Sequence, residues 1–124
     1  MIYYTSIEQS EKLLELGLSF KSADMFYNEE PDEIYPKDII DTKCPSVIRE
    51  EHKHYLEEYG IPCWSIGALL ELMPESYQLT RGKDNKCQFM LFHILIHDWF
   101  NTPFEAVYNM VCYLLENGYI KKET

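Results

Sequence analysis

Apolar residues fall on one helical face near the start of the chain, within Ile7–Leu18. Ser6 and Gln9 stand at the two positions of a capping box, in which each side chain binds the other residue's backbone N–H. Gly17 suits the left-handed residue that ends many helices. The pattern predicts a helix from Ile7 to Leu16.

A second amphipathic pattern lies near the other end. Thr102 can cap a helix, Pro103 suits the first helical position, and Glu105 stands where a capping box places its acid. Asn117-Gly118 provides the stop signal. This segment predicts a helix whose apolar stripe consists of Phe104, Val107, Tyr108, Val111, Leu114 and Leu115.

Two further helices are expected in the middle of the chain. The first spans Ser46–Tyr59, and Gly60 and Pro62 follow it as terminators. Ser65 can cap the second, which Pro74 ends. The apolar positions of this second helix are Ile66, Leu69, Leu70 and Met73.

The pattern then changes from helical to strand-like. Ser76–Thr80 is a short strand candidate, Arg81–Lys86 is a polar turn, and Cys87–His97 is dense in apolar residues. A covered strand or a buried helical segment fits Cys87–His97. The order of elements favours an α+β fold of three or four helices packed on a small antiparallel sheet, with a hairpin at about residues 76–97. The 124 residues are the length of one domain.

The negative net charge of the chain argues against nucleic acids and membranes as partners. The chain carries a net charge of −10, and residues 1–60 hold 14 acids and 6 bases. This excess repels phosphates and anionic lipids, so we expect no direct nucleic acid binding and no membrane association. The longest apolar run, Phe89–Ile96, is too short to span a bilayer, and the first residues lack the features of a signal peptide. We therefore expect a cytoplasmic protein.

The acidic excess is concentrated in an expected loop at about residues 28–43, beside several of the ten tyrosines. Tyrosine buries a large ring and keeps a polar tip, so it is favoured at protein interfaces. Most of these rings could equally pack on the core. The predicted interaction surface consists of Glu29, Glu30, Asp32, Glu33, Tyr27 and Tyr35. An alternative use of such acidity is to mimic DNA and inhibit a nucleic-acid-binding protein.

Signals for catalysis or metal binding are few. Phosphate-binding glycine loops and nucleophile motifs are missing from the sequence, which predicts a protein that is not an enzyme and needs no cofactor or metal. The alternative is a metal-dependent enzyme in which His93 and His97 bind the ion, with Asp98 or Cys87 as a further ligand. The four cysteines lack the close spacing of a zinc motif and are expected to be reduced and structural.

Four stretches together carry a resemblance: Gln9–Leu18, Ala23–Tyr27, Ile61–Pro74 and Thr102–Gly118. Their combination resembles a family of small proteins of no assigned function from gut-bacterial genomes and their phages and prophages. The resemblance implies a small accessory protein of mobile-element origin, which acts through contacts with a protein partner. Within the third stretch, Trp64 precedes the Ser65 cap and is either a hydrophobic staple or an exposed interface anchor.

Overall fold

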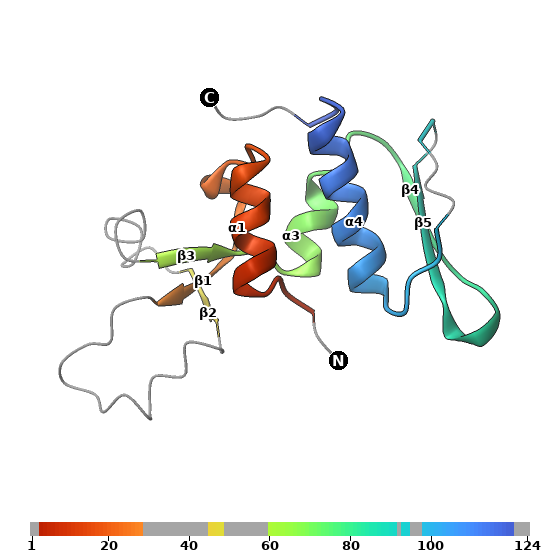
Figure 1. Cartoon of the computed structure of the whole chain (residues 1–124), viewed down its shortest axis with the longest axis horizontal. Helices are drawn as coiled ribbons and strands as arrows, with labels where there is room; N and C mark the ends of the chain where they lie inside the picture. Colours follow the sequence, from red (N-terminus) through yellow and green to blue (C-terminus); the bar gives the residue numbers. More distant parts are fainter. Residues whose placement is uncertain (1–2, 29–44, 49–59, 92, 95–97, 121–124) are drawn as a thin grey trace.

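The computed structural model describes residues 3–28, 45–48, 60–91, 93–94 and 98–120. Within them, three α-helices and two small antiparallel sheets form an α+β fold, which confirms the predicted class (Figure 1). The helices are α1 (Ile7–Glu15), α3 (Ile66–Glu71) and α4 (Pro103–Glu116). The strands are β1 (Met25–Asn28), β2 (Ser46–Val47), β3 (Gly60–Cys63), β4 (Tyr77–Arg81) and β5 (Cys87–Leu91), and 3₁₀ turns cover Phe20–Ser22 and Lys83–Asn85.

Side-chain caps begin all three helices at the predicted residues. Each cap satisfies a backbone N–H that has no partner inside its helix. None of the helices in the described part of the chain is long and apolar enough to cross a membrane. The capping bonds join Ser6 Oγ to the Gln9 N–H at 3.1 Å, Ser65 Oγ to the Ala68 N–H at 3.2 Å, and Thr102 Oγ1 to the Glu105 N–H at 3.1 Å.

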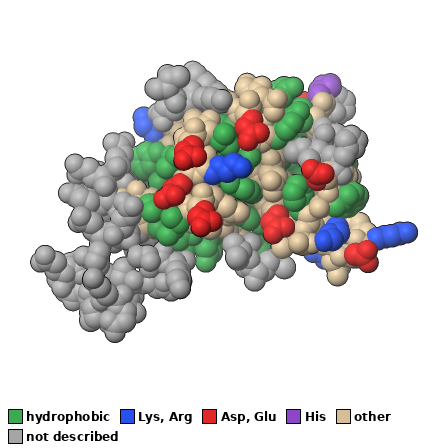
Figure 2. Space-filling view, viewed as in Figure 1, with side chains coloured by type: hydrophobic (Ala, Val, Ile, Leu, Met, Phe, Trp, Pro, Cys, Tyr) green, Lys and Arg blue, Asp and Glu red, His purple; other side chains and the backbone are tan. Residues whose placement is uncertain are grey.

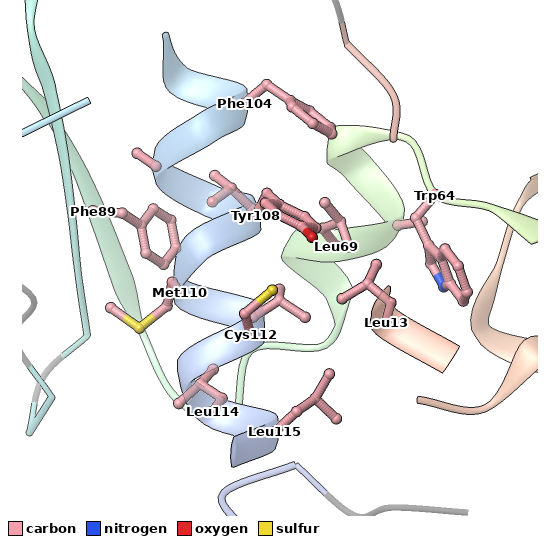
Figure 3. Close-up of a cluster of buried hydrophobic side chains, with 14 of the residues drawn as sticks. Leu13, Trp64, Leu69, Phe89, Phe104, Tyr108, Met110, Cys112, Leu114 and Leu115 are labelled. Atoms are coloured by element: carbon pink, nitrogen blue, oxygen red, sulfur yellow. The ribbon is translucent and has the colours of Figure 1, made fainter. Parts of the chain in front are cut away.

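Helix α4 lies at the centre of the molecule, with α3 and α1 on one side and the β4–β5 hairpin on the other (Figure 1). Because neighbours cover it from both sides, nine of its fourteen residues are buried, and they belong to one apolar cluster with residues of α1, α3 and β5 (Figure 3). Trp64 is fully buried in this cluster. Of the two alternatives for Trp64, the exposed interface anchor is therefore wrong.

The predicted hairpin is present. Strands β4 and β5 pair antiparallel, with Leu79 opposite Phe89 and Arg81 opposite Cys87. Every second residue of β5 is buried against α4. The helical alternative is therefore wrong for Cys87–Leu91, whereas residues 92 and 95–97 lie outside the described part.

The second sheet, with strand order β2-β1-β3, was not predicted. The expected helix from Ser46 is wrong at its start, because Ser46–Val47 pairs with β1 as a strand; residues 49–59 lie outside the described part. Gly60 and Pro62 belong to β3. Proline is tolerated there because β3 is an outer strand of this sheet in the described part of the chain, and an outer strand needs N–H donors on one side only.

Candidate functional site

Of the predicted interaction surface, the structure describes only Tyr27. Its side chain is 3% exposed, and its hydroxyl donates a hydrogen bond of 2.7 Å to the backbone oxygen of Thr5. Tyr27 is thus an interior residue, and its assignment to a contact surface is corrected. The other members of that surface lie outside the described residues: Glu29, Glu30, Asp32, Glu33 and Tyr35.

Tyr27 belongs to a buried polar cluster around Thr5. The Thr5 hydroxyl lies 2.8 Å from Ser10 Oγ and accepts a bond of 3.0 Å from the Trp64 N–H. The Cys63 thiol donates to the Thr5 backbone oxygen at 3.3 Å. These bonds tie the N-terminal segment to α1, β1 and β3, so the cluster stabilises the fold and leaves no hydroxyl of its own unpaired for chemistry.

The described cysteines are all buried free thiols: Cys63, Cys87 and Cys112. Burial raises the pKa of the Cys63 thiol, against the smaller lowering effect of its hydrogen bonds. Burial likewise raises the pKa of Cys112. A thiol with a raised pKa is a poor nucleophile and a poor metal ligand, because both roles use the thiolate.

The histidine alternative is described only in part, because His97 lies outside the described residues. His93 is exposed, and its Nδ1 lies 3.1 Å from Glu75 Oε2. Its backbone N–H donates to Glu75 Oε1 at 2.7 Å. Asp98 is exposed and Cys87 is buried. Among the residues that the structure covers, no three histidine, cysteine or acidic side chains gather as metal ligands.

An open pocket of about 390 Å³ lies between the N-termini of α1 and α4. Helix N-termini attract anions, but here capping side chains already bind the N–H groups of Gln9 and Glu105. Gln9 Oε1 accepts from the Ser6 N–H, and Glu105 Oε2 accepts from the Asn101 N–H. With Glu8 also in its wall, this pocket has the wrong charge for an anion.

Within the described residues, no strand pairs with the outer edge of β4. Strand β5 pairs with β4 along one side. On the other side of β5, Cys87 and Phe100 are joined by two backbone hydrogen bonds of 2.7 Å. No other strand of the described chain pairs with β4, which is therefore an edge strand.

The hydrogen-bond alternation of the ladder fixes which residues face this edge. In antiparallel pairs, residues bonded to the neighbouring strand alternate with residues whose N–H and C=O point away from it. Gly82 donates to the Lys86 oxygen at 2.8 Å, so Gly82, Thr80 and Gln78 face β5. The outward-facing residues are Tyr77, Leu79 and Arg81, which we call the hairpin edge.

Two of the three side chains of the hairpin edge are large, apolar and exposed. Tyr77 is 48% exposed and Leu79 is 42% exposed. Both lie on the same sheet face as the buried Phe89, and Tyr77 stacks on the Phe89 ring with 5.3 Å between centroids. Tyr77 and Leu79 therefore lie on the face of the hairpin that packs against α4, but outside the area that α4 covers. On the opposite face, Trp99 is 45% exposed.

Charge differs between the two ends of the molecule. From Tyr77 to Leu91 the chain holds Arg81, Lys83 and Lys86 against Asp84, a local net charge of +2 in a chain of −10. Figure 2 shows basic side chains gathered at the hairpin end, whereas acidic side chains predominate over the helices. Helix α1 carries three exposed acids: Glu8, Glu11 and Glu15.

The hairpin edge was not among the predicted site residues, although its strand was predicted. Sequence could have indicated it by Leu79, an apolar residue between Gln78 and Thr80 in a strand that precedes a basic turn. Comparison of the chain with protein-family models, curated proteins and solved structures finds no match.

Proposed function

We propose that this protein is a non-enzymatic accessory protein that acts by binding protein, and that the hairpin edge is its contact surface. One observation carries the proposal: β4, whose outer edge has no partner strand in the described part of the chain, bears two apolar side chains that are each nearly half-exposed. Edge strands expose rows of free N–H and C=O groups that template pairing with another chain. Proteins use such edges to bind an extended segment by strand addition.

Protection normally accompanies an edge strand that has no partner. Charged residues pointing inward, prolines or bulges blunt such edges against unwanted pairing. Strand β4 contains neither proline nor bulge, and its one charged residue, Arg81, stands at its end. The middle of the edge is Leu79. An edge without these defences is expected where pairing is the function.

Photo-crosslinking tests this proposal. A photoreactive phenylalanine analogue replaces Tyr77 in one variant and Tyr3, which is 53% exposed, in a control variant. After irradiation in cells of the source organism, we expect a protein adduct from position 77 and little from position 3. Adding Leu79→Lys should remove the adduct, because a charge on the edge opposes strand pairing.

Leu14→Lys is the matched control, since Leu14 is 37% exposed on α1. It should leave the adduct unchanged. Equal adducts from positions 77 and 3, or an adduct that survives Leu79→Lys, would contradict the proposal. If binding of the partner is unchanged by Leu79→Lys but is lost at high salt, the DNA-mimic alternative is favoured. Binding through many charge pairs weakens as ionic strength rises.

A further inference from the structure

We propose that the hairpin edge pairs with a second copy of this chain, β4 against β4, around a two-fold axis at Leu79. This inference rests on the proposed function and names the partner of that same surface. The resulting interface is isologous, so each copy offers the same residues to the other.

Register supports a second copy as the occupant. Antiparallel pairing of β4 with itself around Leu79 places Leu79 opposite its counterpart and Tyr77 opposite Arg81 of the second copy. All three outward-facing residues then exchange hydrogen bonds, as the ladder alternation requires. If the axis lay at Gln78 or at Thr80 instead, one of the three residues of the hairpin edge would no longer be opposite a hairpin-edge residue of the second copy.

Side-chain chemistry matches the same register. Leu79 meets an identical apolar side chain, which removes exposed apolar surface of both from water. Tyr77 meets Arg81 of the second copy on the shared face, where a guanidinium can lie against the aromatic ring. The pairing also separates the two Arg81 residues by about four strand positions, or roughly 13 Å, which is beyond the screening length at 0.1 M salt.

In the paired dimer, the exposed apolar side chains of each hairpin, Tyr77 and Leu79, would be covered. With strands about 4.8 Å apart, the two β5 strands in the order β5-β4-β4-β5 lie roughly 14 Å apart. Each β5 carries its own α4, and a helix with side chains is about 10 Å wide. Tyr77 and Leu79 of both copies would fill the space between the two helices.

The distribution of charge is compatible with this dimer, because the acidic helices of the two copies lie far apart. In Figure 1, α1 and the hairpin lie on opposite sides of α4, so pairing through the hairpins keeps the acidic α1 helices at the far ends of the assembly. The contact is short, and small interfaces are weak and transient. We therefore expect a dimer that dissociates on dilution.

Cysteine trapping tests the register. Residues opposite each other in a hydrogen-bonded antiparallel pair have Cα atoms about 5.5 Å apart, which a disulfide can span. Under mild oxidation the Leu79→Cys variant should form a covalent dimer. Leu14→Cys, with similar exposure, should react no more than wild type, which controls for the native thiols. Tyr77→Cys alone should not dimerise but should link to Arg81→Cys when the two variants are mixed.

Sedimentation of the unmodified chain from about 10 μM to about 1 mM, the range of weak association, gives an independent measurement. We expect a rising mass that Leu79→Lys abolishes and Leu14→Lys does not. A monomer throughout, with no trapping above the Leu14→Cys background, would overturn the second copy as occupant. If position 77 then still crosslinks to a different protein, the proposed function stands; if position 77 crosslinks to nothing, both proposals fail.

Discussion

The indole ring of Trp99 occupies the space that a side chain at position 82 would need. A Cβ atom built on Gly82 would lie 2.6 Å from Cζ3 of Trp99 and 2.8 Å from Cη2. These distances are shorter than van der Waals contact, so the ring and the backbone of the hairpin turn are fitted to each other. The aromatic ring thereby braces the turn that joins β4 to β5.

Gly82→Ala should therefore displace Trp99. We expect a change in the NMR signal of the Trp99 indole N–H, with the buried Trp64 signal unchanged, and a loss of stability of roughly 1 kcal/mol from overpacking. The control is Gly67→Ala, because a Cβ there would lie 3.7 Å from Ser65 Oγ and fits. That change should stabilise helix α3 by up to about 1 kcal/mol. Identical spectra for wild type and Gly82→Ala would contradict the fit.

Two buried threonine hydroxyls should respond oppositely to replacement by valine. Thr5→Val removes the acceptor of the Trp64 N–H and the partner of Ser10, and should lower the free energy of unfolding by about 1–3 kcal/mol. Thr80 Oγ1 is buried and has no hydrogen-bond partner among the described residues. Thr80→Val should therefore be neutral or stabilising, since valine hides no unpaired hydroxyl and favours strands. Urea denaturation measures both, and equal losses would contradict the assignment.

Glu75 should titrate below its ordinary pKa of 4.5, because the backbone N–H and then the side chain of His93 hydrogen-bond to its carboxylate. A lowered folded-state pKa stabilises the protein fully above the unfolded value, and this stability is lost as pH falls through the folded pKa. Side-chain carbon NMR measures the titration. His93→Ala keeps the backbone bond, so it should return the pKa only part of the way. In the Glu75→Gln variant, the stability difference from wild type should shrink as pH falls below 4.5.

Cys63 and Cys112 should react slowly with alkylating reagents in the folded protein. Burial raises the pKa of each thiol, so little thiolate is present near pH 8. We expect alkylation in the folded protein to be slower than in urea, because unfolding exposes both thiols to the reagent and removes the burial that raises their pKa. Peptide mass spectrometry assigns the rate to each residue. Native rates equal to those in urea would show that these thiols are accessible.

Helices were predictable because their signals are local. Ser6 with Gln9, Ser65, and Thr102 with Pro103 mark helix starts through bonds within four residues, and the structure contains all three. The three-stranded sheet was missed because its strands are two to four residues long and pair across the chain. Such short strands show no period, and Pro62 argues against a strand unless its place at a sheet edge is already known.

For the hairpin edge, the strand was predictable but its position at the edge of the sheet was not, again because pairing depends on distant residues. Alternation around Leu79 predicts a strand, but whether β4 is central or at an edge depends on which distant segments pair with the hairpin. Within the described residues, Phe100 bridges to β5 and no strand pairs with the outer side of β4. Nothing between Tyr77 and Leu91 carries that information. Tyr27 shows the reverse error, because proximity to acidic residues suggested exposure, whereas its hydroxyl is bound to Thr5 inside the fold.

The central position of α4 has a consequence for how the protein is made. Of the seventeen described residues that are buried in the main cluster, nine belong to α4, so the residues before Pro103 cannot complete this core by themselves. During translation, Leu69 and Phe89 leave the ribosome before the helix that packs between them. We therefore expect the nascent chain to stay open to chaperones and proteases until Leu115 has emerged, and then to fold in one step.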